Sequence, residues 1–374
     1  MPGHRPQTKR YRSRGTRTRD PARLDSSTTG TDAGRPIIDT AGPRRDDADR
    51  TVAELGEFAV IGRAVEGRRQ PATTLLGPGD DAAVVRAPDG RVAVSADMLV
   101  EGRHFRLDWS TPDQVGRKAV AQNGADIAAM GARPTAFLVS LGCPADTPVS
   151  VAAGISDGIG RAAESLGAGV VGGDLVQSDQ VVVSVTALGD LEGREPVLRS
   201  GATPGDVVAV AGTLGRSAAG LALLLAGLVR EGEVPDEVSA ALVAAHRVPT
   251  PPYGAGLAAA RGGASAMTDI SDGLVADLGH IADASGVRIR IDRSRIALDR
   301  LLVAVAERVG GDPWNWILTG GEDHALAATF PASVTPPDGW TVIGEVVGGA
   351  DGPAVLVDGR PWTVSGGWES FGAG

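Results

Sequence analysis

The sequence predicts an α/β or α+β protein of about two domains. Its 374 residues exceed the usual size of one domain. Short apolar runs of strand length alternate with longer segments in which apolar residues recur at helical spacing. A stretch rich in proline and glycine, from Arg194 to Gly205, interrupts this alternation and indicates a boundary. We therefore expect three parts, which are residues 1–50, 51–192 and 193–374.

Residues 1–50 are expected to form a disordered, basic extension. Arginines gather there among serine, threonine, proline and glycine, and apolar residues are few. Such a segment cannot bury enough apolar surface to offset the entropy of ordering it. A tail that binds RNA or a membrane is the alternative that the arginines leave open. The segment also lacks the apolar stretch of a signal peptide.

The middle part, residues 51–192, is predicted to form a mixed sheet with helices, in the order β-β-α-β-α-β-β after a short helix. Thr51 and Glu54 have the spacing of a capping box, which favours a helix start. Residues 77–104 predict a strand, a turn and a second strand, and Thr111 with Pro112 is typical of a helix start. The remaining elements are expected as a helix to residue 130, a strand over 135–141, a helix over 149–166, and strands over 169–174 and 181–188.

The last part, residues 193–374, is predicted to be an α/β sandwich domain. After Gly273 an amphipathic helix is expected, with Leu274 and Leu278 on its apolar side and Asp277 and Asp283 on solvated faces. The other expected elements are strands over 207–210, 264–267, 287–291, 325–330 and 340–347 and helices over 217–229 and 240–246.

Composition excludes several classes of protein. The net charge of −10 argues against a nucleic-acid binder, because phosphate backbones are bound by clustered lysine and arginine. A single cysteine, Cys143, excludes internal disulfides and multi-cysteine zinc sites, and it favours a reducing compartment such as the cytoplasm. No apolar run is long enough to predict a membrane span.

Aspartates recur beside glycine or where an apolar strand is predicted to end. A partly buried carboxylate in such a place is unfavourable unless a cation or a hydrogen-bond donor meets it. Lysine is scarce, since Lys9 and Lys118 are the only two, so the expected cation is a bound metal such as Mg²⁺, which usually accompanies phosphate chemistry. A helix cap is the alternative for any one of these residues, Asp272 above all. The aspartates are Asp80, Asp81, Asp97, Asp126, Asp174, Asp269 and Asp272.

The usual phosphate-binding motifs are missing from the sequence. A P-loop needs a Gly-Lys pair, and none occurs. The strand lysine and catalytic loop of protein kinases are also missing, as is a dinucleotide-binding glycine motif in the right context. If the protein handles a nucleotide, we expect it to do so through metal ions, arginine and backbone N–H groups.

Six ordered motifs carry a resemblance to a known family. They are GDDAAVV, SADMLVEGRHF, NGADIAAMGARP, VGGDLVQSD, TDISDGLVADLGHIADASG and LTGGEDHAL. Together they resemble thiamine-monophosphate kinase, of the aminoimidazole ribonucleotide synthetase and selenophosphate synthetase superfamily, from about Thr51 to Phe371. The resemblance implies a two-domain aminoimidazole ribonucleotide synthetase-like fold and ATP-dependent phosphorylation of thiamine monophosphate to thiamine diphosphate. It also implies several Mg²⁺ ions and a homodimer whose N-terminal halves pair.

The resemblance also implies roles for individual residues. His104 and Glu322 would hold the thiamine end, together with an aromatic residue near the C-terminus. Where the family usually has Thr this chain has Ala96, so any metal contact there must use the carbonyl oxygen, and His324 stands where Tyr is common. The implied metal shell is Asp81, Ser95, Ala96, Asp97, Asp126, Asp174, Asp269 and Asp272. The implied ATP contacts are Gly173, Asp174, Arg199 and Ser271, and the candidate aromatic residues are Trp368 and Phe371.

The chemistry explains why the sequence offers many acids and no evident general base. The acceptor would itself be a phosphate with a second pKa near 6, so it is already a nucleophile at neutral pH. The main barrier is then repulsion between two polyanions, which metal ions and arginine relieve. We expect direct in-line transfer without a phosphoenzyme. Two alternatives remain: a sister synthetase of the same fold, and a non-catalytic sensor of thiamine phosphate or nucleotide.

Overall fold

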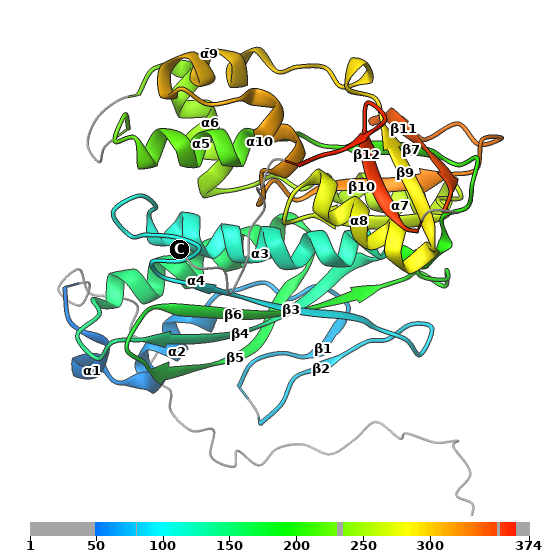
Figure 1. Ribbon diagram of the computed structural model, residues 1–374. Coiled ribbons are helices and arrows are strands. Elements are labelled where there is room, and N and C mark those ends of the chain that lie inside the picture. The colour runs from blue at the N-terminus through cyan, green and yellow to red at the C-terminus, as the bar shows by residue number, and fades with distance from the viewer. Residues whose placement is uncertain (1–48, 80, 230–234, 350–351, 364–374) are drawn as a thin grey trace, which may run out of the picture. The chain divides into compact units, whose positions relative to one another are not determined.

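The computed structural model describes residues 49–79, 81–229, 235–349 and 352–363 (Figure 1). The predicted basic extension therefore lies outside the described residues, apart from its last two positions. The chain enters the described part through two short helices, α1 (Val52–Leu55) and α2 (Glu57–Val65). The predicted capping box is confirmed, because Thr51 Oγ1 accepts from the Glu54 N–H and the Glu54 carboxylate accepts from the Thr51 N–H.

A four-stranded mixed sheet organises the N-terminal half, in the order β3-β6-β4-β5. Its inner face packs on α3 and α4, since Val183, Val185 and Ala187 of β6 belong to the same buried cluster as Val115 and Ile155 of the two helices. Its outer face carries the alternate residues of each strand. The elements are β3 (Ala93–Val100), α3 (Pro112–Ala129), β4 (Arg133–Cys143), α4 (Val149–Ser165), β5 (Gly169–Gln177) and β6 (Val182–Asp190), with a separate two-stranded sheet of β1 (Thr74–Leu76) and β2 (Val84–Val85).

A seven-stranded sheet organises the C-terminal half, in the order β13-β12-β9-β11-β7-β10-β8. Neighbouring strands are antiparallel except for the parallel pair β9 and β12. The strands are β7 (Val207–Ala211), β8 (Ala266–Ile270), β9 (Val287–Ile291), β10 (Ala325–Phe330), β11 (Trp340–Gly348), β12 (Ala354–Val357) and β13 (Arg360–Pro361). The helices are η2 (Arg199–Gly201), α5 (Arg216–Leu225), α6 (Glu237–Arg247), α7 (Tyr253–Arg261), α8 (Leu274–Ser285), η3 (Arg293–Arg295), α9 (Arg300–Val309) and α10 (Pro313–Thr319).

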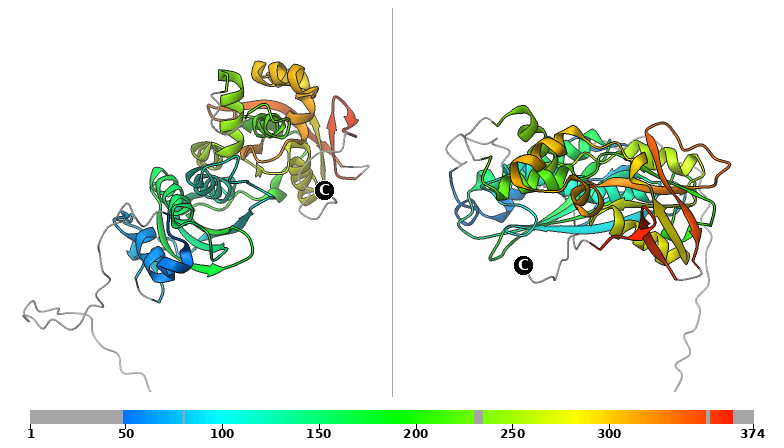
Figure 2. Two further views of the ribbon diagram at one scale, coloured as in Figure 1. Left: turned by 90° about the vertical axis from the view of Figure 1, so that its left-hand side faces the viewer. Right: turned by 45° about the horizontal axis from the view of Figure 1, so that its top comes forward.

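Helix α3 joins the two halves. It packs against α4, β3 and β6 on the N-terminal side and against α7 and β8 on the C-terminal side, as two further views also show (Figure 2). Glycines permit the close approach: a Cβ on Gly124 would lie 2.8 Å from the Tyr253 ring, and one on Gly256 would collide with the Ala128 carbonyl oxygen. Residues of both halves therefore meet along one helix.

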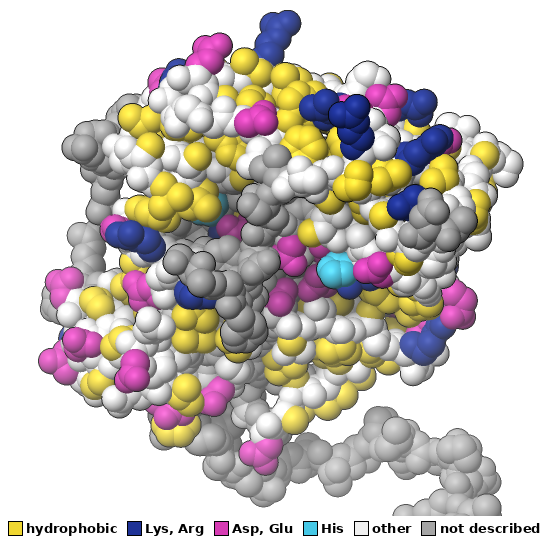
Figure 3. Space-filling model, viewed as in Figure 1, with side chains coloured by type: hydrophobic (Ala, Val, Ile, Leu, Met, Phe, Trp, Pro, Cys, Tyr) yellow, Lys and Arg dark blue, Asp and Glu magenta, His cyan; other side chains and the backbone are white. Residues whose placement is uncertain are grey.

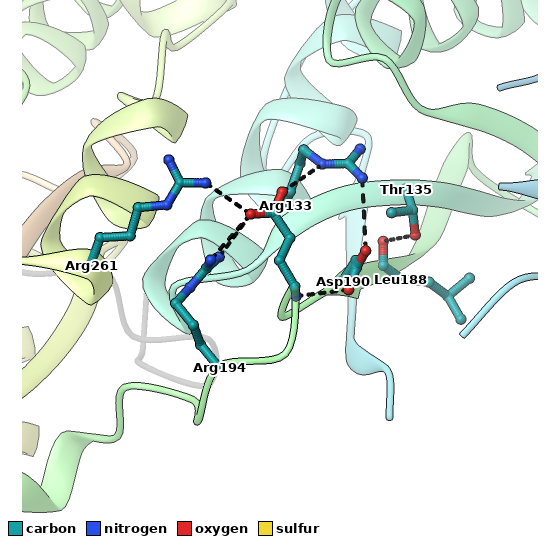
Figure 4. A network of polar contacts seen from close by, with 7 residues as sticks. Arg133, Thr135, Leu188, Asp190, Arg194 and Arg261 are labelled. Carbon is teal, nitrogen blue, oxygen red and sulfur yellow. Dashed lines mark hydrogen bonds and ion pairs between the residues drawn. The ribbon is translucent and has the colours of Figure 1, made fainter. Parts of the chain in front are cut away.

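A polar network lies where the chain passes from one half to the other (Figure 4). The Glu192 carboxylate accepts from Arg261 of α7 at 2.9 Å and from Arg133 of β4 at 3.3 Å. Arg194 also contacts it, and Glu192 itself has a positive φ of 52°. These contacts tie α7 to the ends of the two central strands, β4 and β6, of the four-stranded sheet.

Most predicted elements are confirmed, but the first strand pair is wrong. Val84 pairs with Leu76 of β1, whereas β3 pairs with β6. Pairing with β6 allows the inner residues of β3 to pack on α3, which a hairpin with β2 would not provide. Asp97 and Asp269 lie inside β3 and β8, not at their ends. In the described part, no helix has the length and apolar character needed to span a bilayer.

Candidate functional site

Four aspartates from both halves lie close enough to influence one another's ionisation. Asp97 is on the inner face of β3, Asp126 is near the end of α3, Asp269 is in β8, and Asp272 follows β8. We call these four the acidic cluster. Burial first, then the charges of Asp269 and Asp97, raise the pKa of Asp126 to about 7. Burial and Asp269 likewise raise the pKa of Asp272. The backbone thus brings together carboxylates that repel one another.

Local contacts fix the N-terminal members of the acidic cluster. Ser95 Oγ donates to Asp126 Oδ2 at 2.5 Å. The Asp97 N–H donates to Asn123 Oδ1. Asn123 Nδ2 in turn donates to the Ala119 carbonyl oxygen in α3. Ser95 and Asp97 share the inner face of β3, because side chains two residues apart on a strand share a face. Helix α3, which packs on that face, brings Asp126 to Ser95.

Asp277 holds the loop that contains Asp272 through two hydrogen bonds to its backbone. One oxygen of the Asp277 carboxylate accepts from the N–H groups of Asp272 and Gly273, each at 3.0 Å. The expectation that Asp277 lies on a solvated face is wrong, since it is 1 % exposed, whereas Asp283 is exposed as predicted. Burial and the nearby Asp269 raise the pKa of Asp277 to about 7. Asp277 directly precedes the buried Leu278 in α8. At this position its carboxylate turns back toward the N-terminus of the helix.

His324 lies against the acidic cluster. Its Nδ1 lies 3.3 Å from Asp269 Oδ2, and both side chains are buried. Burial lowers the pKa of His324, but the contact with Asp269 outweighs it, so the pKa lies above its ordinary value. His324 Nε2 is buried and has no hydrogen-bond partner among the residues that the structure describes. The positive φ values of Glu322 and His324 show that this loop holds a backbone conformation that few non-glycine residues adopt.

Glu322 and His104 meet beside the acidic cluster through Lys118. Glu322 Oε1 lies 3.0 Å from Lys118 Nζ, and Glu322 Oε2 lies 3.6 Å from His246 Nδ1. Burial raises the pKa of Glu322, but Lys118 and His246 overcome that effect and the pKa lies below its usual value. The Glu322 N–H donates to the Ser271 carbonyl at 2.7 Å, so the Glu322 loop also touches the Asp272 loop.

Other residues implied by the resemblance lie elsewhere. Asp174 and Ala96 are on the outer face of the four-stranded sheet, whereas Asp97 is on the inner face. Strand β5 is also three strand spacings from β3, roughly 14 Å. Gly173 and Asp81 are exposed. Arg199 Nε donates to Thr268 Oγ1 at 3.2 Å, and the Thr268 side chain leaves β8 on the side opposite to Asp269. Trp368 and Phe371 lie outside the described residues.

The chemistry of the acidic cluster fits a hard divalent cation. Its donors are carboxylates and the Ser95 hydroxyl, which are the oxygen ligands that Mg²⁺ prefers. Across the described ranges, no three His, Cys, Asp or Glu side chains form a ready metal cage. Mg²⁺ does not need one, because it usually keeps waters and substrate phosphate oxygens among its ligands. On the face shown in Figure 3, acidic side chains surround an exposed histidine near the middle.

Sequence reasoning missed three residues of this site: Lys118, His246 and Asp277. Lys118 had a signal, since it is the only lysine after Lys9 and stands among the small residues of a buried helix. Asp277 is five residues after Asp272, a spacing that lets a carboxylate return to the N-terminus of its own helix. His246 gave no signal, because its role depends on the packing of α6 against α3 and α5.

Comparisons with known proteins agree with this architecture. Residues 79–191 match the family model "AIR synthase related protein, N-terminal domain", and residues 203–320 match "AIR synthase related protein, C-terminal domain". The fold and the acidic site thus define an AIR synthase related protein, as the predicted fold class implied. Within that class the chain belongs to the thiamine-monophosphate kinase family.

Individual relatives support that membership. The thiamine-monophosphate kinase of Mycobacterium tuberculosis is 61% identical over 324 residues, which cover 86% of this chain and 93% of the relative. The crystal structure of thiamine monophosphate kinase from Aquifex aeolicus is 36% identical, with a TM-score of 0.67 over 83% of this chain and 98% of that chain. A structure described as AaThiL complexed with AMPPCP and TMP gives a TM-score of 0.69 over 85% and 98% of the two chains, also at 36% identity.

Proposed function

We propose that this chain transfers the terminal phosphoryl group of ATP to thiamine monophosphate, giving thiamine diphosphate. The 61% identity to a thiamine-monophosphate kinase over nearly its whole length supports this activity, as does the likeness to a structure described with AMPPCP and TMP. The observation that carries the proposal is the acidic cluster, which both halves of the chain build beside the Glu322 loop.

Different groups of residues would bind Mg²⁺, ATP and the thiamine end of the acceptor. Ser95, Asp97, Asp126, Asp269 and Asp272 would hold Mg²⁺. When bound, the ions would supply the positive charge that two polyanions need in order to approach. Ser271 lies between Asp269 and Asp272 in the chain and could contact ATP, and Glu322 and His104 would hold the thiamine end. Arg199, which the resemblance also assigns to ATP, contacts Thr268 on the side of β8 opposite to Asp269. Ala96 offers only its backbone.

No residue need act as a general base in this reaction. A phosphate acceptor with a second pKa near 6 is already ionised at neutral pH. The protein's task is then to align the acceptor oxygen with the transferring phosphorus and to exclude water. We propose direct in-line transfer without a phosphoenzyme. Inversion of configuration at the transferred phosphorus is the expected result, and retention would exclude a single direct transfer.

We also propose that two copies pair through the outer face of the four-stranded sheet. Val94, Met98, Leu138 and Val176 are 60%, 52%, 39% and 53% exposed there, which makes an apolar face unusual for a monomer. Asp174 lies on the same face, so pairing would bring it close to a second chain and could make it part of a shared site. Light scattering should give the mass of a dimer, and Met98→Glu should shift the protein toward the monomer.

The remaining parts of the proposal are the domain limits and the compartment. An N-terminal domain of residues 51–192 for ATP, Mg²⁺ and dimer contacts, and a C-terminal domain of residues 193–374, follow the division between the two sheets. A cytoplasmic location is supported by the single, buried Cys143, since a reducing compartment needs no disulfide. We propose no nucleic-acid or membrane partner for the described part.

A coupled assay with ATP, Mg²⁺ and thiamine monophosphate tests the activity. ADP and thiamine diphosphate should appear in equal amounts, and omission of thiamine monophosphate should stop ADP production. Binding of both ligands without ADP would instead identify a sensor. ADP formed with another acceptor, but not with thiamine monophosphate, would identify a sister enzyme of the same fold.

A further inference from the structure

Lys118 is among the largest fully buried side chains of the described part, at 2 % exposure. It lies in the middle of α3, on the side that meets the C-terminal half. A buried ammonium group is unfavourable unless its protons find acceptors. Its Nζ has two, since it donates to the His104 carbonyl oxygen at 3.0 Å and lies 3.0 Å from Glu322 Oε1. Lys118 of α3 thus connects two segments that are far apart in the sequence, one at His104 and one at Glu322.

The segment on the N-terminal side is the turn that follows β3. His104 is held there by its own ring, since the Val100 N–H donates to His104 Nδ1 at 3.0 Å. A ring nitrogen that accepts a hydrogen bond carries no proton, so a neutral His104 keeps its proton on Nε2. Burial lowers the pKa of His104, which favours this neutral form. Lys118 holds the carbonyl of the same residue, so both the ring and the backbone of His104 are fixed.

The segment on the C-terminal side is the Glu322 loop. Both oxygens of the Glu322 carboxylate have a partner, Lys118 on Oε1 and His246 on Oε2. Ser217 Oγ and Glu322 both approach the same nitrogen of His246, Nδ1. A proton relay needs two different ring nitrogens, so Ser217, His246 and Glu322 do not form a catalytic triad. Their arrangement instead holds the Glu322 carboxylate in one orientation.

We propose that Lys118 is a positioning residue for thiamine monophosphate, which holds His104 and Glu322 in a fixed relation across the two halves. This inference rests on the proposed function, because it takes His104 and Glu322 as the residues that bind the thiamine end. In the described part, Lys118 has the His104 carbonyl and Glu322 as its partners, and none of the four aspartates of the acidic cluster is among them. Its loss should therefore weaken the use of thiamine monophosphate far more than the use of ATP.

The test compares Lys118→Met with Arg117→Met. Methionine keeps the length of the buried side chain but removes its charge. Arg117 is the matched control, because it precedes Lys118 on α3 and makes only a long surface ion pair with Asp113 at 3.9 Å. We expect Lys118→Met to raise KM for thiamine monophosphate by about tenfold or more and KM for ATP by no more than about twofold. Arg117→Met should leave both unchanged.

A double-mutant cycle tests whether Lys118 acts through Glu322. Lys118→Met alone leaves the partly buried Glu322 carboxylate without its lysine partner and could prevent folding. Lys118→Met combined with Glu322→Gln leaves a neutral pair, so that variant keeps the test available. Relative to Glu322→Gln alone, the double variant should raise KM for thiamine monophosphate by less than Lys118→Met raises it in the wild type, because only the contact with the His104 carbonyl is then lost. Fully additive effects of the two substitutions would overturn the proposal, because Lys118 and Glu322 would then act independently.

Two measurements separate this inference from the proposed function. Wild-type protein is assayed first, and if it forms no thiamine diphosphate the proposed function fails. If the wild type is active but Lys118→Met has an unchanged KM for thiamine monophosphate, or equal rises for both substrates, only the inference fails. Calorimetric titration of thiamine monophosphate into the folded variants, without ATP, should give the same ranking of affinities without relying on turnover.

Discussion

The buried carboxylate of Asp277 accepts a hydrogen bond from the backbone N–H of Asp272 at 3.0 Å, five residues earlier in the chain. The same oxygen accepts from Gly273, whose φ of 124° few other residues could adopt. Asp277 thereby fixes the direction in which the Asp272 side chain leaves the loop. A residue that contacts no substrate can in this way determine the shape of the acidic cluster.

Replacing Asp277 should separate the role of its hydrogen bonds from that of its charge. Asp277→Ala removes the acceptor and should lower kcat at least about tenfold and the free energy of unfolding by about 1–3 kcal/mol. Asp277→Asn keeps an oxygen acceptor and should stay within about threefold of the wild-type kcat. Steady-state kinetics and urea unfolding check both values. Equal losses in the two variants would mean that charge, not geometry, is the contribution of Asp277.

The acidic cluster itself should be sensitive to single charge removals. Asp97→Asn and Asp272→Asn should each lower turnover at least about tenfold, the effect of roughly 1.4 kcal/mol of lost transition-state stabilisation. Asp283→Asn is the control, because Asp283 is exposed on α8 and should leave turnover unchanged. Initial rates at saturating ATP and Mg²⁺ measure the effect. Near-normal rates in both cluster variants would end the metal-shell proposal.

Mg²⁺ alone should stabilise the fold, because it relieves repulsion among the carboxylates of the acidic cluster. A ligand that binds only the native state raises stability by mass action. We expect thermal unfolding, followed by circular dichroism, to shift upward by a few degrees when millimolar Mg²⁺ replaces EDTA, by the relation between stability and Tm. Asp126→Asn should reduce the shift. A shift of the same size in that variant would place the stabilising metal elsewhere.

Asp323 should make stability depend on pH. It is buried, and it accepts from the N–H groups of Gly215 at 2.5 Å and Ser217 at 2.8 Å, at the N-terminus of α5. Burial raises the pKa of Asp323 to about 7, above its value of about 3.9 in an unfolded chain. The unfolded state therefore loses its proton first. The stability that the protonated form contributes is complete below about pH 4 and is lost as pH rises through 7.

The measurement is urea unfolding from pH 4 to 8 in EDTA, for wild type and Asp323→Asn. The asparagine cannot titrate, so the difference in unfolding free energy between the two proteins should shrink as pH rises, by up to about 1.4 kcal/mol per pH unit. Parallel curves over this range would show that another group is responsible for the pH dependence.

The junction of α3 and α7 should tolerate no side chain at Gly256. A Cβ there would collide with the Ala128 carbonyl oxygen, so Gly256→Ala should lower the free energy of unfolding by about 1–3 kcal/mol. Gly254 lies in the same helix, and a Cβ there would meet nothing within 4 Å. Gly254→Ala should therefore be neutral or stabilise by up to about 1 kcal/mol. Chemical unfolding of both variants checks the contrast.

Much of the fold was predictable because its signals are local. Thr111 caps α3 through Gln114, as the sequence pattern around Pro112 indicates. Most strands of the two sheets also follow from short apolar runs, but β12 and β13 were not expected. Strand partners were less predictable, since β2 and β3 are close in sequence but belong to different sheets. Helix α9 was missed although Leu302 and Val305 have helical spacing, and α7 was missed because its small residues give almost no periodicity.

The sequence indicated many of the residues that belong to the candidate site, but not how they are arranged in space. The resemblance named the aspartates, and the structure brings Asp97, Asp126, Asp269 and Asp272 together. No local pattern shows that Asp174 faces the other side of the sheet, because that depends on how β5 aligns with β4. The partners of Glu322 were hidden for a similar reason, since Lys118 and His246 are far from it in sequence.

Because lysine is rare in this protein, cleavage by a lysine-specific protease can report whether its fold is intact. An endoprotease that cleaves only after lysine has two targets in the chain, Lys9 and Lys118, and Lys118 is 2 % exposed in the middle of a helix. Cleavage at Lys118 therefore requires that α3 come away from its neighbours. The rate at which such an enzyme cleaves that bond would measure how often α3 unfolds around Lys118, without any added label.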